Sequence, residues 1–483
     1  MDLSNSSKNM SKKHSVVSLF SGAGGMDLGF KTGGNFDTIL ANDILLPPAL
    51  TYSYNFGHHI VNVEDFNNNG NYKGNSFPLY ILGDIARVDF SSFNANVDMI
   101  IGGPPCQDFS IVRGTDKERQ GIKVERGRLY AHFIRALHHI QPKAFVFENV
   151  PGLKTANKSM AYQTILKDFS ELHLRWDEIK EIAGNNGRNK VNDYFILFSG
   201  VVDSANFGVP QRRKRLIIIG IRKDLIDNRG SQYHALKDKI SSELNGDNSI
   251  FKKYPLTPLE VFEGKTLPEL QNVYVDIMKS YKDVSDSIKS KRAQKWKEEI
   301  WDCMTFDIIK DYLVANYIKD PIDCKQLDAV FEEHFRLLQE LGYFGVKVQQ
   351  QKFADKSNII PKEAGTVIER LAVIPPDENH EFVRGTKWEV EGRGMSLVYR
   401  RIHPLKPSYT IVAYGGGGTW GYHYQRDRGK LTNRERARLQ TFPDSFLFKG
   451  TSSQVRAQIG EAVPPVLSKK IAQVVDMVLR EVV

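Results

Sequence analysis

Residues 16–30 read VVSLFSGAGGMDLGF: an apolar run, a turn with three glycines and the start of an amphipathic stretch. An unbroken run of Val, Leu and Phe predicts a strand that is buried on both faces of a parallel sheet. Gly22, Gly24 and Gly25 let a ligand approach the backbone of the turn, and the helix that follows offers free N–H groups. The stretch therefore predicts an α/β fold with a binding site where the first strand ends.

The same alternation of apolar runs and amphipathic stretches continues to about residue 225. Strands rich in Val, Ile and Phe are predicted at 15–20, 38–42, 80–83, 97–101, 144–147 and 216–221. Between them, 127–140 is predicted to be a helix because its apolar side chains recur with helical spacing. Strands that alternate with helices in this way predict a doubly wound, mostly parallel sheet.

Beyond about residue 226 the sequence becomes more polar and the alternation is lost. Helices are predicted near 266–293, 298–317 and 321–341, the last with Asp320 as its N-cap, Pro321 in its first turn and Gly342 at its end. Strand-like segments return after residue 400, and a final helix is predicted over 465–479.

These changes in polarity and in the alternation of strands and helices predict the domain organisation. We predict a polar tail (1–14) and a catalytic and cofactor-binding domain (15–225) that is completed by 452–483. A second, smaller domain would occupy 226–451 and carry a helical insert at about 255–345.

Composition limits the classes of protein to which the chain can belong. Its 483 residues include 66 Lys and Arg against 57 Asp and Glu, a net charge of +9 that suits a nucleic-acid partner without establishing one. No apolar run approaches the roughly 18 residues of a membrane span, and the polar start MDLSNSSKNM does not resemble a secretory signal. Three cysteines in a chain of this length rule out a disulfide framework and suggest a reducing compartment.

Histidine spacing gives no indication of a metal site. The pairs His58–His59 and His138–His139 lack the cysteine or acidic neighbours that a metal site needs. We therefore predict no bound metal and place these histidines on the surface or on helix faces.

Two acidic residues follow the second and third predicted strands, Asp43 in ILANDI and Asp84 in LGDI. Taken singly, each is most simply a helix N-cap. Taken together after the glycine turn, they favour an adenosine-type cofactor, because such acids suit ribose hydroxyls and the adenine amine. The dinucleotide fingerprint needs a glycine at position 27, where this chain has Asp27, so a nicotinamide cofactor is disfavoured.

Three further motifs place reactive side chains near predicted strand ends. GGPPCQDFS holds Cys106 on a turn stiffened by two prolines, where its thiolate could act as a nucleophile; a lone cysteine is otherwise a small buried residue. AFVFENV ends near Glu148, which could protonate a ring nitrogen or simply cap a helix. QRRKR sets Gln211, Arg213 and Arg215 on one side of an extended segment, facing substrate or, alternatively, solvent.

In their order along the chain, FSGAGG, LGDI, GPPCQ-x-FS, FENV, QRRKR and GEAVPP resemble the motifs of the DNA (cytosine-5) methyltransferases. The resemblance covers about 15–221 and 400–475, and six ordered motifs are far more specific than any one alone. It implies an S-adenosylmethionine-dependent methyltransferase fold. It also implies methyl transfer from S-adenosyl-L-methionine to C5 of a cytosine flipped out of a short duplex site. The region 226–399 takes the place of the family's variable target-recognition domain.

The resemblance assigns roles to the reactive residues. Cys106 matches the nucleophile that adds to C6 of cytosine, and Glu148 matches the residue that holds N3 and the exocyclic amine. Arg215 matches the arginine that holds the ring carbonyl. The full catalytic set implied by the resemblance is Cys106, Gln107, Glu148, Asn149, Arg213 and Arg215.

Binding residues follow from the same motifs. The cofactor set implied by the resemblance is Phe20, Gly22, Gly24, Gly25, Asp43, Ile44, Asp84, Ile85, Pro105, Leu129, Glu461, Ala462 and Val463. Ile44 stands where the family often has a larger residue against the adenine, and Glu461 stands where Asn is also found. The segment 108–128 resembles a mobile loop that closes on DNA. Its expected phosphate contacts are Ser110, Arg113, Lys117 and Arg119, the alternative being a loop that touches nothing.

Other functions stay open beside the leading one. Cytosine-5 methyltransferases that act on transfer RNA share these motifs, and a catalytically silent DNA-binding relative would keep the fold. A nicotinamide oxidoreductase is the remaining alternative among enzymes. For the leading hypothesis we expect double-stranded DNA as partner, with no metal and no membrane. The chain would be a cytoplasmic monomer in a prokaryotic cell, acting on nucleoid DNA as the modification partner of a restriction endonuclease.

Overall fold

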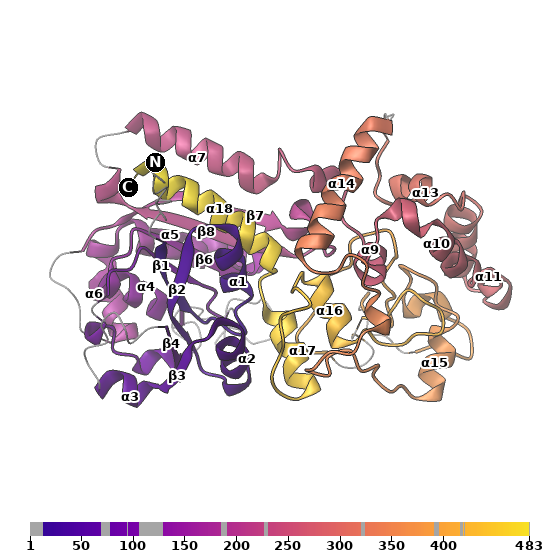
Figure 1. Cartoon of the computed structure of the whole chain (residues 1–483), viewed down its shortest axis with the longest axis horizontal. Helices are drawn as coiled ribbons and strands as arrows, with labels where there is room; N and C mark the ends of the chain where they lie inside the picture. The colour runs from indigo at the N-terminus through magenta and orange to yellow at the C-terminus, as the bar shows by residue number, and fades with distance from the viewer. Residues whose placement is uncertain are drawn as a thin grey trace, which may run out of the picture.

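The computed structural model describes residues 13–68, 78–93, 95–105, 129–184, 191–226, 230–319, 324–390, 396–415, 419 and 421–482. Within these residues, an eight-stranded sheet has the order β3-β4-β2-β1-β5-β6-β8-β7 (Figure 1). The strands are β1 (His14–Leu19), β2 (Phe36–Asp43), β3 (His59–Asn62), β4 (Leu79–Leu82), β5 (Met99–Gly102), β6 (Ala144–Asn149), β7 (Tyr194–Asp203) and β8 (Lys214–Arg222). Only β8 runs antiparallel to its neighbours, β6 and β7. The predicted doubly wound, mostly parallel sheet is confirmed.

Two of these strands, β3 and β7, are not predicted from the sequence. β3 is four residues long and its side chains are partly or fully exposed, so it has no buried apolar run to reveal it. β7 lies at the edge of the sheet, and Ser199 and Gly200 interrupt its apolar pattern. Short or interrupted strands at a sheet edge lack the continuous Val and Ile runs from which central strands are predicted.

Two layers of helices cover the sheet. Alternate side chains of β5 point to opposite faces, so that Met99 and Ile101 join one core and Ile100 joins the other. On the first face lie α1 (Gly25–Gly33), α7 (Gly230–Asn245) and α18 (Pro465–Val482); on the second lie α4 (Leu129–Ile140), α5 (Met160–Ser170) and α6 (Leu172–Ala183). Beside β3 and β4 lie α2 (Leu46–Phe56) and α3 (Val63–Asn68). We call this part, residues 13–245 together with α18, the sheet half.

The C-terminal helix α18 returns to the sheet half and packs closely on α1 (Figure 1). The close approach depends on Gly29 and Gly33 of α1. An added Cβ at either residue would lie 2.5 Å from a backbone atom of Lys469, so only glycine fits. The helix predicted over 465–479 is therefore present, and it forms part of the core beside the first strand.

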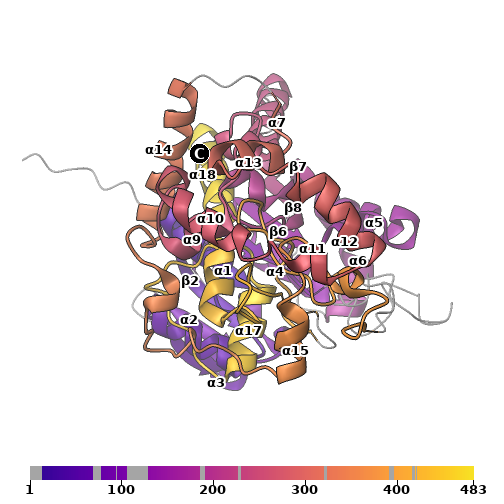
Figure 2. The same cartoon turned by 90° about the vertical axis from the view of Figure 1, so that its right-hand side faces the viewer.

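Residues 250–461 form what we call the second half of the molecule, on the right in Figure 1 and toward the viewer in Figure 2. Its helices are α8 (Ile250–Lys253), α9 (Pro258–Glu263), α10 (Gln271–Lys279), α11 (Val284–Ser287), α12 (Lys291–Trp296), α13 (Ile308–Ala315), α14 (Cys324–Glu340), α15 (Gly365–Leu371), α16 (Asn433–Leu439) and α17 (Ser452–Glu461). The second half has a small hydrophobic core of its own. The rings of Trp296 and Phe382 meet in it, and Tyr281 and Ile374 are also part of it.

Several predictions for the second half are wrong in detail. The single helix predicted over 266–293 is broken into α10, α11 and α12, and 298–317 holds a π-helical turn at 297–301 and α13. In place of strands after residue 400, the described residues hold isolated bridges such as Arg401 with Tyr422. The predicted helix near 321–341 is α14, which ends before Gly342 at φ 71°; Asp320 and Pro321 lie outside the described residues.

None of the described helices is both long enough and apolar enough to cross a membrane.

Candidate functional site

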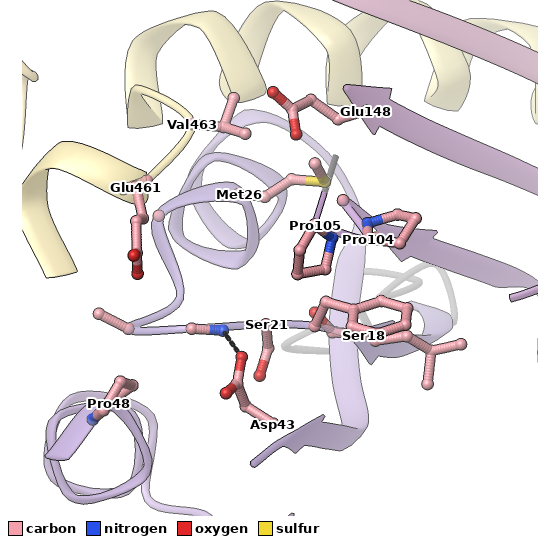
Figure 3. A pocket seen from close by; sticks show the side chains of 18 of the residues that line it. Ser18, Ser21, Met26, Asp43, Pro48, Pro104, Pro105, Glu148, Glu461 and Val463 are labelled. Atoms are coloured by element: carbon pink, nitrogen blue, oxygen red, sulfur yellow. Dashed lines mark hydrogen bonds between the residues drawn. The ribbon is translucent and has the colours of Figure 1, made fainter. Parts of the chain in front are cut away.

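A pocket of about 630 Å³ opens where β1, β2, β4, β5 and β6 end (Figure 3). Parallel strands bring these ends to one edge of the sheet, which is where ligands of such folds bind. With the exception of Gly24, every described residue of the predicted catalytic and cofactor sets lines this pocket. Cys106, Gln107, Ser110, Arg113, Lys117 and Arg119 lie outside the described residues.

The turn after β1 uses its glycines in different ways. Gly22 has φ 52° and open space beside it, and its N–H donates to Oδ2 of Asp43 over 3.0 Å. Gly24 has φ 89°, and an added Cβ there would lie 2.5 Å from the ring of Phe56. At Gly25 an added Cβ would lie 2.6 Å from the carbonyl oxygen of Val463. Gly22 thus leaves room for a ligand, whereas Gly24 and Gly25 make room for the protein's own packing.

Two carboxylates lie where β2 and β4 end, as the sequence predicts, but their surroundings differ. Asp43 accepts hydrogen bonds from Gly22 N–H and, over 3.1 Å, from Leu45 N–H; burial raises the pKa of its carboxyl. Asp84 accepts from Ala86 N–H over 2.9 Å and so caps the short 3-10 turn that follows it. Ile44, beside Asp43, has 62% of its surface exposed at the pocket.

Glu148, at the end of β6, is held on two sides. Its Oε1 lies 2.8 Å from Nε of Arg215 on β8, and its Oε2 faces Gly103, where an added Cβ would lie only 2.5 Å away. Burial raises the pKa of the Glu148 carboxyl, and the charges of Arg215 and Arg213 oppose that effect. The pair therefore holds a carboxylate in the pocket at one defined position.

Asn149 connects this carboxylate to the turn that leads toward Cys106. Its side-chain amide donates to the carbonyl oxygen of Pro104 over 3.0 Å and accepts from Val150 N–H over 2.8 Å. Pro105, the next residue of the turn, is the last one described and lies on the pocket wall in Figure 3. The turn that ends the described segment at Pro105 is thus tied to the strand that carries Glu148.

The row of Gln211, Arg213 and Arg215 does not face one ligand as a unit. Gln211 is fully buried and bonds to Gln440 and Ile411, so the prediction that it reaches substrate is wrong. Arg213 is also buried, and its guanidinium donates to the carbonyl oxygens of Ile411, Gly460 and Glu461. Burial lowers its pKa. Of the three, Arg215 is the one paired with a carboxylate of the pocket.

Residues 461–463, at the end of α17 and just beyond it, close the pocket over the glycine turn. Figure 3 shows the Glu461 carboxylate pointing toward that turn, with Val463 beside Met26. Burial raises the pKa of Glu461, and the negative charge of Asp43 adds to the effect. On the far wall, Leu129 begins α4.

Gly103 and Tyr414 are among the lining residues of the pocket that are not predicted from the sequence. In the sequence, Gly103 is only the second of two glycines before Pro-Pro-Cys, and Tyr414 is only the residue before a run of glycines. Neither signal is specific, because the role of each residue depends on a partner far away in the chain.

Among the described residues, no group of three or more His, Cys, Asp and Glu side chains is placed to hold a metal ion. The prediction that His58 lies on the surface or on a helix face is wrong, since the residue lies outside the helices and its side chain is buried beside Tyr52. His138 lies on a helix face as predicted, although it too is buried and its ring stacks on Trp176 at a centroid distance of 3.7 Å.

Comparison with known families agrees with this site. The family model of the C-5 cytosine-specific DNA methylases matches residues 14–476, and the chain therefore belongs to that family. It is a DNA (cytosine-5) methyltransferase, as the order of its motifs predicts.

Individual relatives support the assignment along almost the whole chain. The DNA (cytosine-5-)-methyltransferase M.ApeKI of Aeropyrum pernix is 55% identical over 97% of this chain and 99% of its own. The type II methyltransferase M.NgoFVII of Neisseria gonorrhoeae is 30% identical over 94% of this chain and 84% of its own. A solved DNA modification methyltransferase encoded within an Escherichia coli prophage has the same fold, with a TM-score of 0.50 and 21% identity over 97% of this chain and 100% of its own.

Proposed function

We propose that this methyltransferase uses S-adenosyl-L-methionine to methylate a cytosine that it flips out of a short, specific duplex site. The observation that carries the proposal is the pocket itself. A glycine turn and Asp43 lie in it together with Glu148 and Arg215, and Pro105, which precedes Cys106 in the sequence, is part of its wall. A cofactor and a base could therefore meet in one enclosure.

The pocket residues fit the cofactor chemically. The Asp43 carboxylate, fixed by the N–H of Gly22, suits the two ribose hydroxyls. Asp84 and Ile85 suit the adenine edge, while Pro105 and Leu129 supply apolar walls. When bound, the cofactor supplies an activated methyl group on its sulfonium; the acceptor carbon must be made nucleophilic by the protein.

That activation would fall to three side chains. The Cys106 thiolate adds to C6 of cytosine, which forms an S–C6 bond and places electron density on C5. Glu148 holds N3 and the exocyclic amine, and Arg215 holds the ring carbonyl, so that the added charge is stabilised. After C5 has taken the methyl group, a base removes the C5 proton, the S–C6 bond breaks and the thiolate is restored.

Arg213 has a supporting part in this scheme. Because its guanidinium is bonded to three backbone carbonyls, it would position the segments around the pocket and not touch the base. Asn149 would likewise position the turn that carries Cys106. The remaining predicted contacts, Gln107, Ser110, Arg113, Lys117 and Arg119, would line the base pocket or meet phosphates.

Residues 226–451 would form the target-recognition domain, in which side chains read base edges in the major groove. Several relatives are named type II methyltransferases, which supports a place as the modification enzyme beside a restriction endonuclease. We propose that the enzyme acts on DNA as a monomer, because one chain holds all the residues assigned above.

The decisive test compares cells that express the wild type with cells that express Cys106→Ala. Base-resolution cytosine-conversion sequencing should find protected cytosines confined to one short motif in the wild type and none in the variant. The purified variant should still bind S-adenosyl-L-methionine. A variant that retains full turnover would remove Cys106 from the mechanism, and an absence of protection in both would favour RNA or a silent binder.

The affinity for duplex DNA gives an independent test. Each phosphate contact releases counterions, so the logarithm of the binding constant should fall linearly and steeply as the logarithm of the salt concentration rises. Titrations of one duplex at several salt concentrations measure this slope, and a flat response would contradict a DNA substrate.

A further inference from the structure

The surface next to the pocket carries basic residues without acidic ones. Residues 149–162, 204–222 and 400–426 each contribute at least one residue to the pocket wall, and none of these stretches contains Asp or Glu. The cations of the third stretch that reach the surface are paired, as Arg400 and Lys406 are with Asp377. Four cations of the first two stretches are exposed or half-buried, and we call them the rim cations: Lys154, Lys158, Arg212 and Lys214.

The rim cations have little compensating charge within the protein. Nη1 of Arg212 lies 3.7 Å from Oδ2 of Asp203, and 58% of the Arg212 side chain is exposed. Among the described residues, the other three rim cations take part in no ion pair. At the opposite edge of the sheet, by contrast, Arg480 lies 2.7 Å from Asp476. The positive charge beside the pocket is therefore available to an anionic partner outside the chain.

Lys214 lies on the side of the sheet that α4, α5 and α6 cover. Along β8, Leu216 belongs to the core under those helices, whereas Ile217 belongs to the core of the other face. Side chains alternate along a strand, so Lys214 shares the side of Leu216, and Arg215 shares the side of Ile217 and meets Glu148. Alternate residues of one strand thus serve the pocket and the surface beside it.

Lys154 and Lys158 lie on the same side, in the turns that precede α5. Nζ of Lys154 is 5.5 Å from the ring centre of Tyr162, a residue of α5 that belongs to the same core as Leu216. Lys158 and Ser159 have φ values of 54° and 67°, although neither is glycine. Such a backbone is unfavourable and persists only where the surrounding structure imposes it. Lys158 is therefore held at a defined place on the surface.

We propose that the rim cations bind backbone phosphates of the duplex that flanks the target cytosine. This inference rests on the proposed function, because it takes duplex DNA as the substrate. A cytosine held by Glu148 and Arg215 leaves its own phosphates at the mouth of the pocket, so the strand continues over the residues beside it. The rim cations come from two separate stretches of chain, which suits an extended polyanion better than a single phosphate group.

The position of the rim cations assigns them to one flank of the target. The core of the other face of the sheet continues into the second half, where it includes Leu256 and Tyr343. The rim cations lie on the face away from that continuous core. They and the second half would thus meet the duplex on different sides of the flipped base. Phosphate contacts carry no sequence information, so the rim cations would fix the position of the duplex while other residues read its bases.

The experiment measures the salt dependence of binding to a duplex that carries the motif found by conversion sequencing. It compares the wild type with Arg212→Gln/Lys214→Gln and with Lys154→Gln/Lys158→Gln. For each double variant we expect the slope of log affinity against log salt to become shallower by about 2, and affinity at low salt to fall by about 10-fold. Binding of S-adenosylhomocysteine should not change.

The matched control is Lys239→Gln/Arg480→Gln, which removes the same charge from exposed residues near the opposite edge of the sheet. It should leave the slope and the affinity at their wild-type values. An equal change in the control would reduce the effect to net charge and overturn the inference, as would unchanged slopes in both rim variants. Weaker binding of S-adenosylhomocysteine would overturn it too, because the rim cations would then support the pocket.

Duplexes trimmed from one end or the other test the assignment to one flank. Trimming the flank that meets the rim cations should weaken binding by the wild type about 10-fold and by the rim variants much less, whereas trimming the other flank should affect all of them alike. Equal losses for wild type and variants at both ends would overturn the inference. A rim variant that loses affinity for transfer RNA but not for the duplex would overturn it in favour of RNA. A wild type that neither binds nor methylates the duplex would instead overturn the proposed function.

Discussion

In the sheet half, backbone N–H and C=O groups pair with each other along the strands, whereas in the second half many carbonyls pair with buried arginine side chains. Arg401 is fully buried and lies within hydrogen-bonding distance of five backbone carbonyl oxygens, those of Leu371, His423, Gln425, Arg426 and Arg428. Arg438 donates to Val261 O and Val346 O and pairs with Asp444.

The difference follows from a general requirement. A buried carbonyl without a hydrogen bond destabilises the fold, so a chain that lacks regular strands must find donors elsewhere. A guanidinium offers five N–H donors in a rigid plane and can serve several carbonyls at once. In the second half, arginines therefore take the place that strand pairing takes in the sheet half. The two halves should respond differently to substitution, the second by losing stability and the sheet half by losing chemistry.

The largest effect is expected from Arg401→Met. The change removes the guanidinium donor from five carbonyl oxygens, of which those of Leu371 and Gln425 keep a backbone N–H donor. The loss is offset only in part because a cation is no longer buried. We expect the free energy of unfolding to fall by about 4 kcal/mol, measured by denaturant titration. Arg384→Met, at an exposed arginine of the same half, should change it by less than about 0.5 kcal/mol. Equal effects from both variants would contradict the role given to Arg401.

This role marks a limit of what the sequence can predict. The central strands could be predicted because Val, Ile and Phe runs report burial locally, and Asp43 and Glu148 could be placed because each follows such a run. Arginine, by contrast, is usually exposed, so nothing in the sequence near Arg401 indicates a core position. Its partners follow from tertiary contacts with α15 and with the loop after Tyr422.

The residues of the site also divide into those that local sequence predicts and those that only tertiary contacts define. The motifs around Asp43, Glu148 and Arg215 lie at strand ends, and the parallel order of the strands brings them together without further information. Gly103 and Tyr414 could not be predicted, because each is defined by contact with a distant segment, Glu148 in one case and Glu461 in the other.

The second prediction concerns Asp27, a buried carboxyl of the sheet half. The hydroxyls of Ser18, Thr38 and Tyr52 donate to it, yet burial still raises its pKa from about 3.8 to about 6. The folded state thus binds a proton more tightly than the unfolded chain. The resulting stabilisation is complete below about pH 4 and is lost as the pH rises through 6.

Asp27→Asn removes this titration. The free energy of unfolding of the wild type, minus that of the variant, should therefore fall by about 3 kcal/mol between acidic and neutral pH. Denaturant titrations of both proteins at a series of pH values give this difference in unfolding free energy. The contributions of all other titrating groups cancel in it, because both proteins share them. A difference that does not change with pH would show that Asp27 keeps an ordinary pKa.

The third prediction tests whether the sheet half fails chemically while it remains folded. In Gly103→Ala the new methyl group would lie 2.5 Å from Oε2 of Glu148, so the carboxylate must move. In the proposed function Glu148 holds the target base, and misplacement of such a group by about 1 Å can lower the rate by about 100-fold. We expect the rate constant of single-turnover methyl transfer to fall by that factor, while cofactor affinity and the unfolding free energy change little.

Gly152→Ala is the matched control, because an added Cβ there meets nothing within 4 Å. It should retain wild-type turnover. If Gly103→Ala retained it as well, the position of Glu148 would not depend on the turn before Cys106.

The smallest effects are expected at two helix starts of the second half. Thr432 and Thr451 are each the N-cap of a helix that begins with a capping box. The threonine hydroxyl accepts a hydrogen bond from the backbone N–H of the residue three positions on, and the side chain of that residue accepts one from the backbone N–H of the threonine. Thr432 is buried and also donates to Asn358 over 2.9 Å, whereas Thr451 is exposed. Thr432→Ala should lower the free energy of unfolding by about 2 kcal/mol and Thr451→Ala by about 0.5 kcal/mol.

The ratio between these two losses of unfolding free energy separates two explanations for what stabilises the helices of the second half. If capping alone stabilised the helices, both substitutions would cost the same, because the two motifs are alike. A larger cost at Thr432 means that the surrounding buried polar network matters, since Arg428 reaches Glu435 of the same motif over 2.9 Å. Thr432→Ser keeps the hydroxyl and should restore most of the loss, which denaturant titration of all three variants would measure. The contribution of the hydroxyl would then be separated from that of the methyl group, and the second half would be held by its buried hydrogen bonds more than by helix propensity.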